Sequence, residues 1–188
     1  SQDTPAGAND PEASVLVLGP GITRSDVKFK LGSLLIDLGQ GDAIHVNDFN
    51  PDDPLSTPVL DAIQFAPSAG SGQAGAQMSY QDVLDQGFDL DGADGDDLIE
   101  GTAVTDRIDA KGGDDHVIAK GGDDAILGGA GDDDLEAGAG NDTLRGGAGK
   151  DTYVFNKGDG TETIFDTPDT GNSAEASVVV LGAGVNQR

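Results

Sequence analysis

The chain of 188 residues lacks cysteine and tryptophan, and only 10 of its residues are Lys or Arg. Without cysteine it has no disulfide framework and no thiolate metal site. Its 35 Asp and Glu residues give a formal net charge of −25. This charge argues against an anionic membrane surface and excludes nucleic acid as an expected partner, because phosphate contacts need a basic face. The longest apolar runs, such as SVVVLGAGV, are too short for a membrane span.

Glycine and acidic residues are abundant, and both gather in one third of the chain. Residues 92–154 hold 15 of the 30 glycines and 16 of the 35 acidic residues. Such a composition is typical of a solvated, disordered segment, or of a fold whose charge is balanced by something outside the polypeptide.

This segment repeats with a nonapeptide period. Cut from Gly92, it falls into seven consecutive rows: GADGDDLIE, GTAVTDRID, AKGGDDHVI, AKGGDDAIL, GGAGDDDLE, AGAGNDTLR and GGAGKDTYV. Position six is Asp in every row: Asp97, Asp106, Asp115, Asp124, Asp133, Asp142 and Asp151. Position eight is apolar or aromatic in every row: Ile99, Ile108, Val117, Ile126, Leu135, Leu144 and Tyr153. Position four is Gly in all rows except one, where Val104 replaces it, and position one is the least regular.

Each row predicts a turn followed by a short strand. Its Gly-rich first six positions suit a backbone with positive φ, and its last three suit a strand with one inward side chain. Two rows then close one coil, and successive coils stack about 4.8 Å apart. The position-six Asp side chains of odd rows therefore fall on one edge and those of even rows on the other.

The stacked Asp side chains predict a bound divalent cation. Unit charges about 4.8 Å apart repel by roughly 3–4 kcal/mol at an effective dielectric near 20. A cation between each stacked pair reverses the sign of this term. Two carboxylates and four turn carbonyls would supply six oxygen ligands, which suit Ca²⁺ better than Zn²⁺ or copper.

The rows resemble the nonapeptide G-G-x-G-x-D-x-U-x of RTX (haemolysin-type calcium-binding) proteins. The resemblance implies a parallel β-roll that binds about five to six calcium ions through the position-six Asp and the carbonyls of positions one to four. On one edge the implied sites lie between Asp97 and Asp115, Asp115 and Asp133, and Asp133 and Asp151; on the other they lie between Asp106 and Asp124, and Asp124 and Asp142. The implied backbone ligands include Gly95, Gly113, Gly122, Gly129, Gly131, Gly138, Gly140, Gly147 and Gly149.

The end of the repeat block is also similar to RTX blocks. After Tyr153 the sequence reads VFNKGDGTETIFD. Shifted by two positions, Gly158, Gly160, Glu162 and Ile164 imitate a last row, with Glu162 in place of Asp. This arrangement implies a sixth site at Glu162.

Residues 14–66 alternate apolar and polar side chains between Gly and Pro clusters, which predicts an antiparallel meander. The stretch resembles the β-domain found beside RTX blocks. We expect this antiparallel β-domain over residues 14–90, with a flexible loop at 67–77 and a short helix near 79–86 that Ser79 caps. The parallel β-roll is expected over residues 91–166, so the fold class is all-β.

A second repeat joins the two ends of the chain. QDTPAGANDPEASVLVLGPGI, from Gln2 to Ile22, matches FDTPDTGNSAEASVVVLGAGV, from Phe165 to Val185, at an offset of 163. One interpretation is two unrelated strands of similar composition. The other is a tandem array, in which residues 1–13 end a preceding unit or form a linker and residues 167–188 begin the next unit. Neighbouring repeat modules of the same chain are then expected partners.

No residues point to an enzyme. Paired acids such as Asp132 and Asp133 could indicate glycosidase chemistry, but their regular recurrence favours ligands or solubilising charge. His45 and His116, the only histidines, lie far apart in sequence, and there is no Ser-His-Asp grouping, P-loop or dinucleotide fingerprint. The sequence therefore predicts a protein without catalytic activity.

The RTX resemblance implies a calcium-folded structural module of a large secreted bacterial exoprotein of adhesin or toxin type. It further implies unfolded export through a type I secretion channel and folding in extracellular calcium. The alternative is a non-catalytic accessory module of a secreted enzyme, such as an alginate epimerase or a lipase. A groove with exposed aromatic and cationic side chains would favour this alternative.

Overall fold

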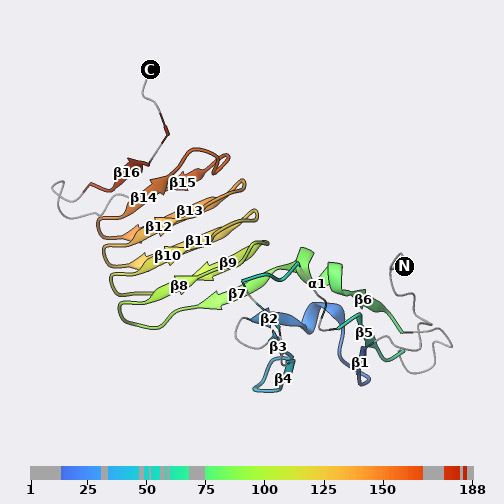
Figure 1. The fold of residues 1–188 in the computed structure, drawn as a ribbon. Coiled ribbons are helices and arrows are strands. Elements are labelled where there is room, and N and C mark those ends of the chain that lie inside the picture. Colours follow the sequence, from blue (N-terminus) through green and yellow to red (C-terminus); the bar gives the residue numbers. More distant parts are fainter. Residues whose placement is uncertain are drawn as a thin grey trace. The chain divides into compact units, whose positions relative to one another are not determined.

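The fold was analysed in a computed structural model (Figure 1), which describes residues 14–30, 34–46, 49–50, 52–55, 58, 60–67, 75–166, 176–182 and 184–185. The expectations for residues 1–13 and for most of the loop at 67–77 lie outside the described residues, as does the start of the expected next unit at 167–175. The chain divides into two units, Ser1–Asn50 with Pro54–Gln86 and Pro51–Asp53 with Gly87–Arg188. No helix in the described part is long and apolar enough to cross a membrane.

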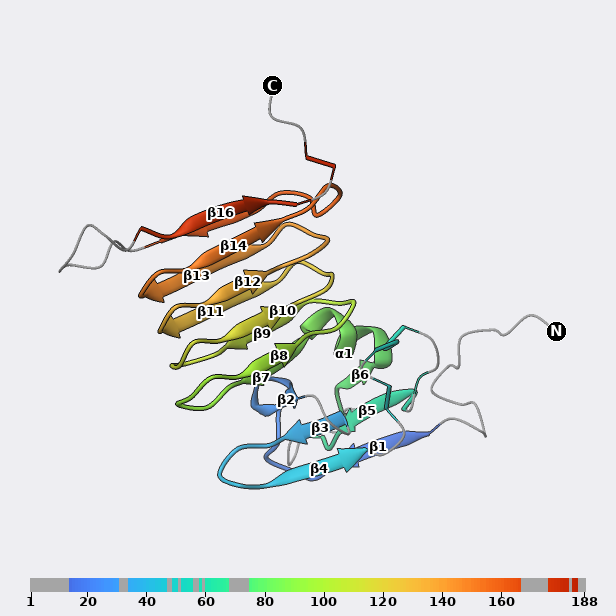
Figure 2. The same cartoon turned by 60° about the vertical axis from the view of Figure 1, so that its left-hand side comes forward.

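The second unit is a solenoid of parallel strands with about four turns, as the repeat predicts (Figures 1 and 2). One sheet has the order β16-β14-β12-β10-β8 and the other includes β15-β13-β11-β9-β7. The first sheet comprises β8 (Leu98–Glu100), β10 (His116–Ile118), β12 (Asp134–Glu136), β14 (Thr152–Phe155) and β16 (Val178–Leu181). The second comprises β7 (Phe88–Asp91), β9 (Asp106–Asp109), β11 (Ala125–Ala130), β13 (Thr143–Ala148) and β15 (Thr163–Phe165).

The register of these strands confirms that two rows make one coil. Val117 pairs with Ile99 in one sheet, and Ile126 pairs with Ile108 in the other. Identical row positions are therefore stacked along each sheet. In the last coil Leu144 pairs with Ile164, two positions beyond the regular register, which matches the shift read from the sequence.

The interior of the roll is filled by position eight. Its side chains are buried in six rows, namely Ile108, Val117, Ile126, Leu135, Leu144 and Tyr153. Position one also faces inward where it carries a methyl group, since Ala110, Ala119 and Ala137 are buried. A methyl group is therefore accommodated at position one in these three rows, whereas a Cβ at position one of the fifth row would meet the carboxylate of Asp133.

In the third, fourth, fifth and seventh rows the turns have positive φ at positions two and four. In the fifth row these are Gly129 at 118° and Gly131 at 134°. A Cβ atom at Gly131 would collide with the carbonyl oxygen of Gly113 in the coil before it, so only glycine fits there. Lys111 and Lys120 occupy position two of their rows with φ of 76° and 78°, a region that non-glycine residues rarely adopt.

In its described part the first unit has six short strands. They are β1 (Val15–Leu18), β2 (Lys28–Lys30), β3 (Leu34–Asp37), β4 (Ala43–Val46), β5 (Ala62–Phe65) and β6 (Gln77–Ser79). β2, β3 and β4 form an antiparallel meander, and β5 and β6 are antiparallel as well. However, β1 lies parallel to β5, so the expectation of a fully antiparallel domain is wrong for this pair. Residues 19–61 join the two strands, and a connection of this length permits parallel pairing.

The core of the first unit includes Phe29, Ile36, Ile63 and Met78, all fully buried. A short 3-10 turn at Arg24–Asp26 lies between β1 and β2. Helix α1 (Tyr80–Gln86) follows directly after β6. Ser79 caps α1: its backbone N–H donates to Asp82 Oδ2 (2.8 Å), and the Asp82 N–H donates to Ser79 Oγ (3.2 Å). The Ser79 hydroxyl also donates to Asp82 Oδ2 (2.6 Å), and this bond, with the Ser79 N–H and Arg24, lowers the pKa of Asp82 to about 2.

Leu135→Ala should destabilise the roll, because Leu135 is fully buried between the two sheets. We expect the free energy of unfolding to fall by about 2–5 kcal/mol, measured by urea titration in millimolar calcium. Leu98→Ala is the matched control, since Leu98 is 65% exposed and its truncation should change the free energy by less than about 0.5 kcal/mol. Equal effects of the two changes would contradict an interior built on position eight.

Candidate metal centre

The position-six aspartates form two columns in the turns of the roll. Six of them are buried, namely Asp106, Asp115, Asp124, Asp133, Asp142 and Asp151, and Asp97 is half-buried. In each column the backbone N–H of one Asp donates to Oδ1 of the Asp two rows later. The five donor–acceptor distances, from Asp97 to Asp133 in chain order, are 2.8, 2.7, 3.0, 2.8 and 3.2 Å. One carboxylate oxygen of each Asp from Asp115 onward therefore ties its coil to the coil before it.

The second carboxylate oxygen has no hydrogen-bond partner in most of the column. Buried, unpaired oxygens are Oδ2 of Asp115, Asp124, Asp133, Asp142 and Asp151 and both carboxylate oxygens of Glu162. Each of the five Asp is the later member of one of the carboxylate pairs expected from the repeat. An unsatisfied buried acceptor costs about 1–3 kcal/mol and more when it is charged, so these oxygens require a partner such as a cation.

Backbone oxygens lie close to these unpaired carboxylates. A Cβ atom at Gly128 would collide with Asp133 Oδ2 and would lie 2.7 Å from the carbonyl oxygen of Gly146. The carboxylate of one row and the position-one carbonyl of the next coil thus converge on the space that glycine leaves open. Carboxylate and carbonyl oxygens together are the ligands that calcium prefers.

The first Asp of each column differs from those that follow. Asp97 Oδ2 accepts the backbone N–H of Ala93, and Asp106 Oδ2 accepts that of Thr102, both at 2.6 Å. Lys111 Nζ also donates to the carbonyl oxygen of Gly92 (2.6 Å), so a positive charge already lies in the first turn. The carboxylates that begin the columns are therefore partly satisfied by the chain itself.

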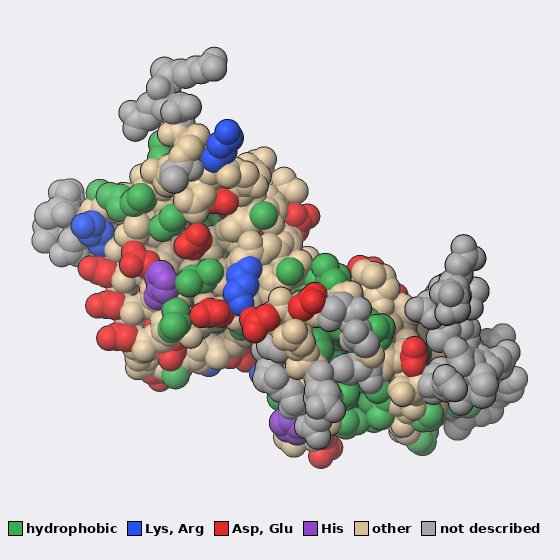
Figure 3. Space-filling model, in the orientation of Figure 1, with side chains coloured by type: hydrophobic (Ala, Val, Ile, Leu, Met, Phe, Trp, Pro, Cys, Tyr) green, Lys and Arg blue, Asp and Glu red, His purple; other side chains and the backbone are tan. Residues whose placement is uncertain are grey.

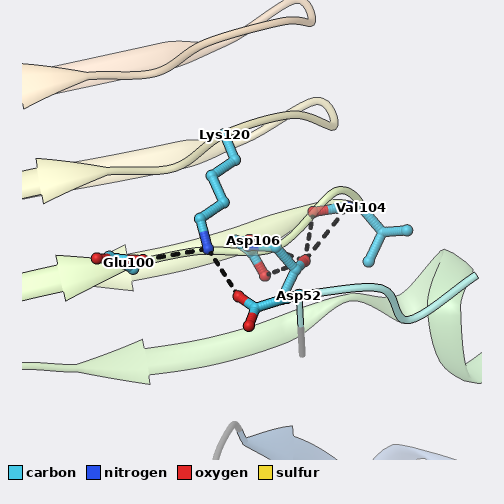
Figure 4. A network of polar contacts seen from close by, with 6 residues as sticks. Asp52, Glu100, Val104, Asp106 and Lys120 are labelled. Atoms are coloured by element: carbon cyan, nitrogen blue, oxygen red, sulfur yellow. Dashed lines mark hydrogen bonds and ion pairs between the residues drawn. The ribbon is translucent and has the colours of Figure 1, made fainter. Parts of the chain in front are cut away.

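Thr102 closes the turn in which Val104 replaces glycine. Its buried hydroxyl contacts Asp106 Oδ1 (3.2 Å) and the carbonyl oxygen of Val104 (3.1 Å), and Val104 does not have a positive φ. Figure 4 shows this turn beside Lys120, whose amine lies 3.3 Å from both Glu100 and Asp52. The sequence indicated the irregular turn at Val104, but the role of Thr102 in closing this turn was not predicted. Both residues replace glycine of the RTX pattern in the same row.

A second column of acidic side chains stands at position five and was also missed. Asp96, Asp114 and Asp132 each accept the backbone N–H of the residue at the same position two rows later, at 2.8–3.0 Å. Asp123 does the same for Asn141 on the other edge (2.9 Å). These side chains are exposed, and Figure 3 shows acidic groups following one another along the edge of the roll. The recurrence of Asp at position five was the available signal.

Burial makes the negative charge of the inner columns unfavourable. It raises the pKa of Asp133 to about 6 and that of Asp124 to about 8, and the neighbouring charges of Asp106 and Asp142 add to the rise at Asp124. The pKa of Glu162 rises to about 7 for the same reason, with Asp142 as the largest contributing charge. A cation at these oxygens would favour the ionised carboxylates instead.

The possible ligands of this candidate centre are stacked carboxylate oxygens and turn carbonyls, and not a cluster of several metal-binding side chains. Within the described ranges no group of three or more His, Cys, Asp or Glu side chains is placed to hold a metal ion. His45 and His116 lie in strands β4 and β10 of different units. The register brings Glu162 level with Asp142, where the end of the repeat block implied a further site. The residues present therefore fit a calcium ion held by one or two carboxylates and turn carbonyls.

Comparison with known proteins identifies the repeat. A family model described as RTX calcium-binding nonapeptide repeat (4 copies) matches residues 91–126, 100–135 and 127–162. No curated protein matches the chain. The match covers the stacked coils but not the first unit. Residues 91–162 are a block of RTX calcium-binding nonapeptide repeats, folded as a structural β-roll.

Proposed function

We propose that the chain is a calcium-folded structural module of a large secreted bacterial RTX exoprotein of adhesin or toxin type. The observation that carries the proposal is the set of buried carboxylate oxygens without partners on stacked coils of RTX repeats. In calcium-poor surroundings these charges oppose folding. Millimolar extracellular calcium saturates even weak sites and adds its binding free energy to the stability of the fold.

The ligands we propose are the position-six carboxylates together with turn carbonyls. Each interior Asp, such as Asp133, would serve one ion toward the preceding coil and one toward the following coil. Backbone oxygens of glycines at positions two and four, such as Gly129 and Gly131, would complete each set. Asp151 ends its column, since its N–H donates to Ser177 Oγ (3.0 Å) and not to another Asp. Together with the pair of Asp142 and Glu162 this gives about five to six ions.

These sites would not be equivalent. Asp97 and Asp106 already accept backbone N–H groups through Oδ2, and Lys111 already donates to a carbonyl of the first turn. The pairs of Asp97 with Asp115 and of Asp106 with Asp124 should therefore bind calcium more weakly than the interior pairs. Filling of the roll would begin in the later coils.

The secreted context and the absence of catalysis are part of the same proposal. Export through a type I channel requires an unfolded chain, and this unit would stay unfolded until it binds calcium, because an ion-free roll with unpaired buried charges is unstable. The acidic groups at positions five and six of the rows accept backbone N–H groups, and the proposal needs no catalytic group. The module would act as a stiff spacer between other parts of the exoprotein.

One observation favours the alternative of an accessory module in a secreted enzyme. Arg145 lies over the ring of Phe165, 4.3 Å from its centroid, and Phe165 is 47% exposed. An exposed cation–aromatic pair is a feature of polysaccharide contacts, but it is a single pair on a strand surface. Titration calorimetry with alginate oligosaccharides tests this alternative, and binding that is lost in Phe165→Ala would support it.

Calcium should fold the second unit. With chelator, circular dichroism should show little β-structure for residues 91–166, and millimolar calcium should restore it cooperatively. Magnesium should substitute poorly, since it demands a tighter octahedron of ligands. A spectrum that does not change between chelator and calcium would contradict the proposal.

The two columns predict how many ions each Asp supports. Asp133→Ala should remove two calcium ions, because Asp133 stands between Asp115 and Asp151, whereas Asp151→Ala should remove one. Asp134→Ala is the matched control: Asp134 is exposed at the adjacent position and should leave the number unchanged. Titration calorimetry counts the ions, and a loss of one ion in both Asp133→Ala and Asp151→Ala would contradict shared ligands.

The pH dependence of stability should change sign with calcium. Because burial raises the pKa of Asp133 to about 6 and that of Asp124 to about 8, the ion-free roll binds more protons than the unfolded chain. Its stability is greatest below the unfolded pKa near 3.8 and is lost as the pH rises through these values. With chelator, lowering the pH from about 8.5 to about 5.5 should therefore raise the free energy of unfolding.

In saturating calcium the same change of pH should lower the stability, because protons compete with the ion for the carboxylates. Urea titrations at both pH values, with and without chelator and in a stabilising osmolyte that keeps the ion-free roll folded, measure the two slopes. The same sign of slope in both solutions would show that the buried carboxylates do not bind the ion.

A further inference from the structure

Strands β1 and β16 are copies of one another. Val15, Val17 and Leu18 of β1 recur as Val178, Val180 and Leu181 of β16, at the same offset that relates the two ends of the sequence. The remaining position exchanges leucine for valine. The structure places these two copies in different sheets.

Each copy lies at the edge of its sheet among the described strands. β1 is the first strand of the order β1-β5-β6 and pairs with β5 in parallel along its whole length. β16 is the first strand of the order β16-β14-β12-β10-β8 and pairs with β14 in parallel along its whole length. Figures 1 and 2 show β16 as the last strand of the roll beyond β14. In the repeated strand, β5 pairs with one edge of β1, and β14 pairs with the opposite edge of β16.

The backbone hydrogen bonds of the two copies alternate. Val178 N–H donates to the carbonyl oxygen of Asp151 and Gly182 N–H to that of Phe155, both at 2.8 Å, so residues 178, 180 and 182 bond to β14. In β1 the carbonyl oxygens of Ser14 and Leu18 accept N–H groups of Asp61 and Ala66, both at 2.9 Å, so residues 14, 16 and 18 bond to β5. With the offset of 163, residues 14, 16 and 18 of the first copy correspond to residues 177, 179 and 181 of the second. No backbone group is used in both pairings.

The side chains of the two copies also agree about which face is inward. Leu18 is 3% exposed in the first unit, whereas Val17 is 63% exposed. In β16, Val179 lines a cavity of about 340 Å³ at the end of the roll, together with Leu144, Tyr153 and Ile164. Val179 corresponds to Leu16, which is on the same face of the strand as Leu18. Val179 is itself 55% exposed in the single chain, so β16 directs this face toward the cavity without burying it.

We propose that in a chain of successive periods of this kind the strand is shared between two modules. Its residues 178 and 180 bond to β14 of one module, and its residues 179 and 181 bond to the β5 of the next. The sheet then runs without a break from β8 through β14 and the shared strand to β5 and β6 of the following module. This inference rests on the interpretation of the repeat at an offset of 163 as a tandem array and on the proposed structural module, but it does not depend on the calcium ligands.

The shared strand has a mechanical consequence. A junction hydrogen-bonded on both sides cannot act as a flexible linker, because bending it would break a ladder of the sheet. It also covers the apolar edge that β16 leaves exposed here, where its side chains are 42–55% accessible. An exposed apolar edge strand invites pairing with another chain, and a following module would remove that hazard.

Amide hydrogen exchange on a two-module chain tests the proposal. The chain consists of residues 1–188 followed directly by residues 26–188, since position 188 corresponds to position 25. In the single chain with saturating calcium, the amides of Val178, Val180 and Gly182 should be protected, and those of Val179 and Leu181 should exchange quickly. In the two-module chain, exchange at the central Val179 and Leu181 should slow by about two orders of magnitude or more.

Three results would overturn the proposal. Val179 and Leu181 could remain fast in the two-module chain while Val178 and Val180 stay protected. They could become protected in the single chain as its concentration rises, which would assign the edge to a second copy. All four could exchange fast while the amides of Val117 and Leu135 stay protected in the same data, which would show that calcium folds the roll without β16 in its sheet.

A pair of proline variants gives an independent readout. In the single chain, Val180→Pro should release β16, because it removes an N–H that bonds to β14, whereas Val179→Pro should leave protection at Val178 and Gly182 in place. In the two-module chain, Val179→Pro should abolish the gain of protection at Leu181. Equal effects of Val179→Pro and Val180→Pro in the single chain would contradict the alternation of hydrogen bonds.

Discussion

The like charges of the stacked aspartates are the constraint on which the second unit depends. Parallel pairing with a register of two rows places identical row positions one above another, at the strand spacing of about 4.8 Å. Asp at position six is therefore brought beside another Asp in every coil, in a turn where it is buried. The chain cannot separate these charges without losing the sheets, so the roll needs either protons or a cation at the carboxylates. The raised pKa of Asp124 expresses the same conflict.

The turns answer this constraint in two ways. In the fifth row glycine at positions two and four turns the backbone, and glycine at position one leaves carboxylate and carbonyl oxygens facing a common space. In the second row Thr102 and Val104 replace the glycines, and the Thr102 hydroxyl and N–H satisfy Asp106 directly. The column that starts at Asp106 thus begins on a turn closed by its own side chains, and the later turns leave a carboxylate oxygen for an ion.

The sequence predicted the roll well because its information is local and periodic. Position six, position eight and the shift before Ile164 follow from the nonapeptide period, and the register confirms them. The pairing of β1 with β5 was wrong, since alternation of apolar residues in a short strand does not determine the direction of a distant partner. Thr102 was missed because its hydrogen bonds to Asp106 depend on how the turn folds. The acidic column at position five was missed because its partners lie a whole coil away.

The most direct test of the account is the effect of Asp124→Asn in two solutions. Asn keeps the shape of the side chain at the centre of its column but removes the charge. With chelator and a stabilising osmolyte, the free energy of unfolding measured by urea titration should rise, because a buried charge has been removed. In saturating calcium with the same osmolyte it should fall, because the ion loses an anionic ligand. A change of the same sign in both solutions would contradict the claim that stacked carboxylates make the roll depend on calcium.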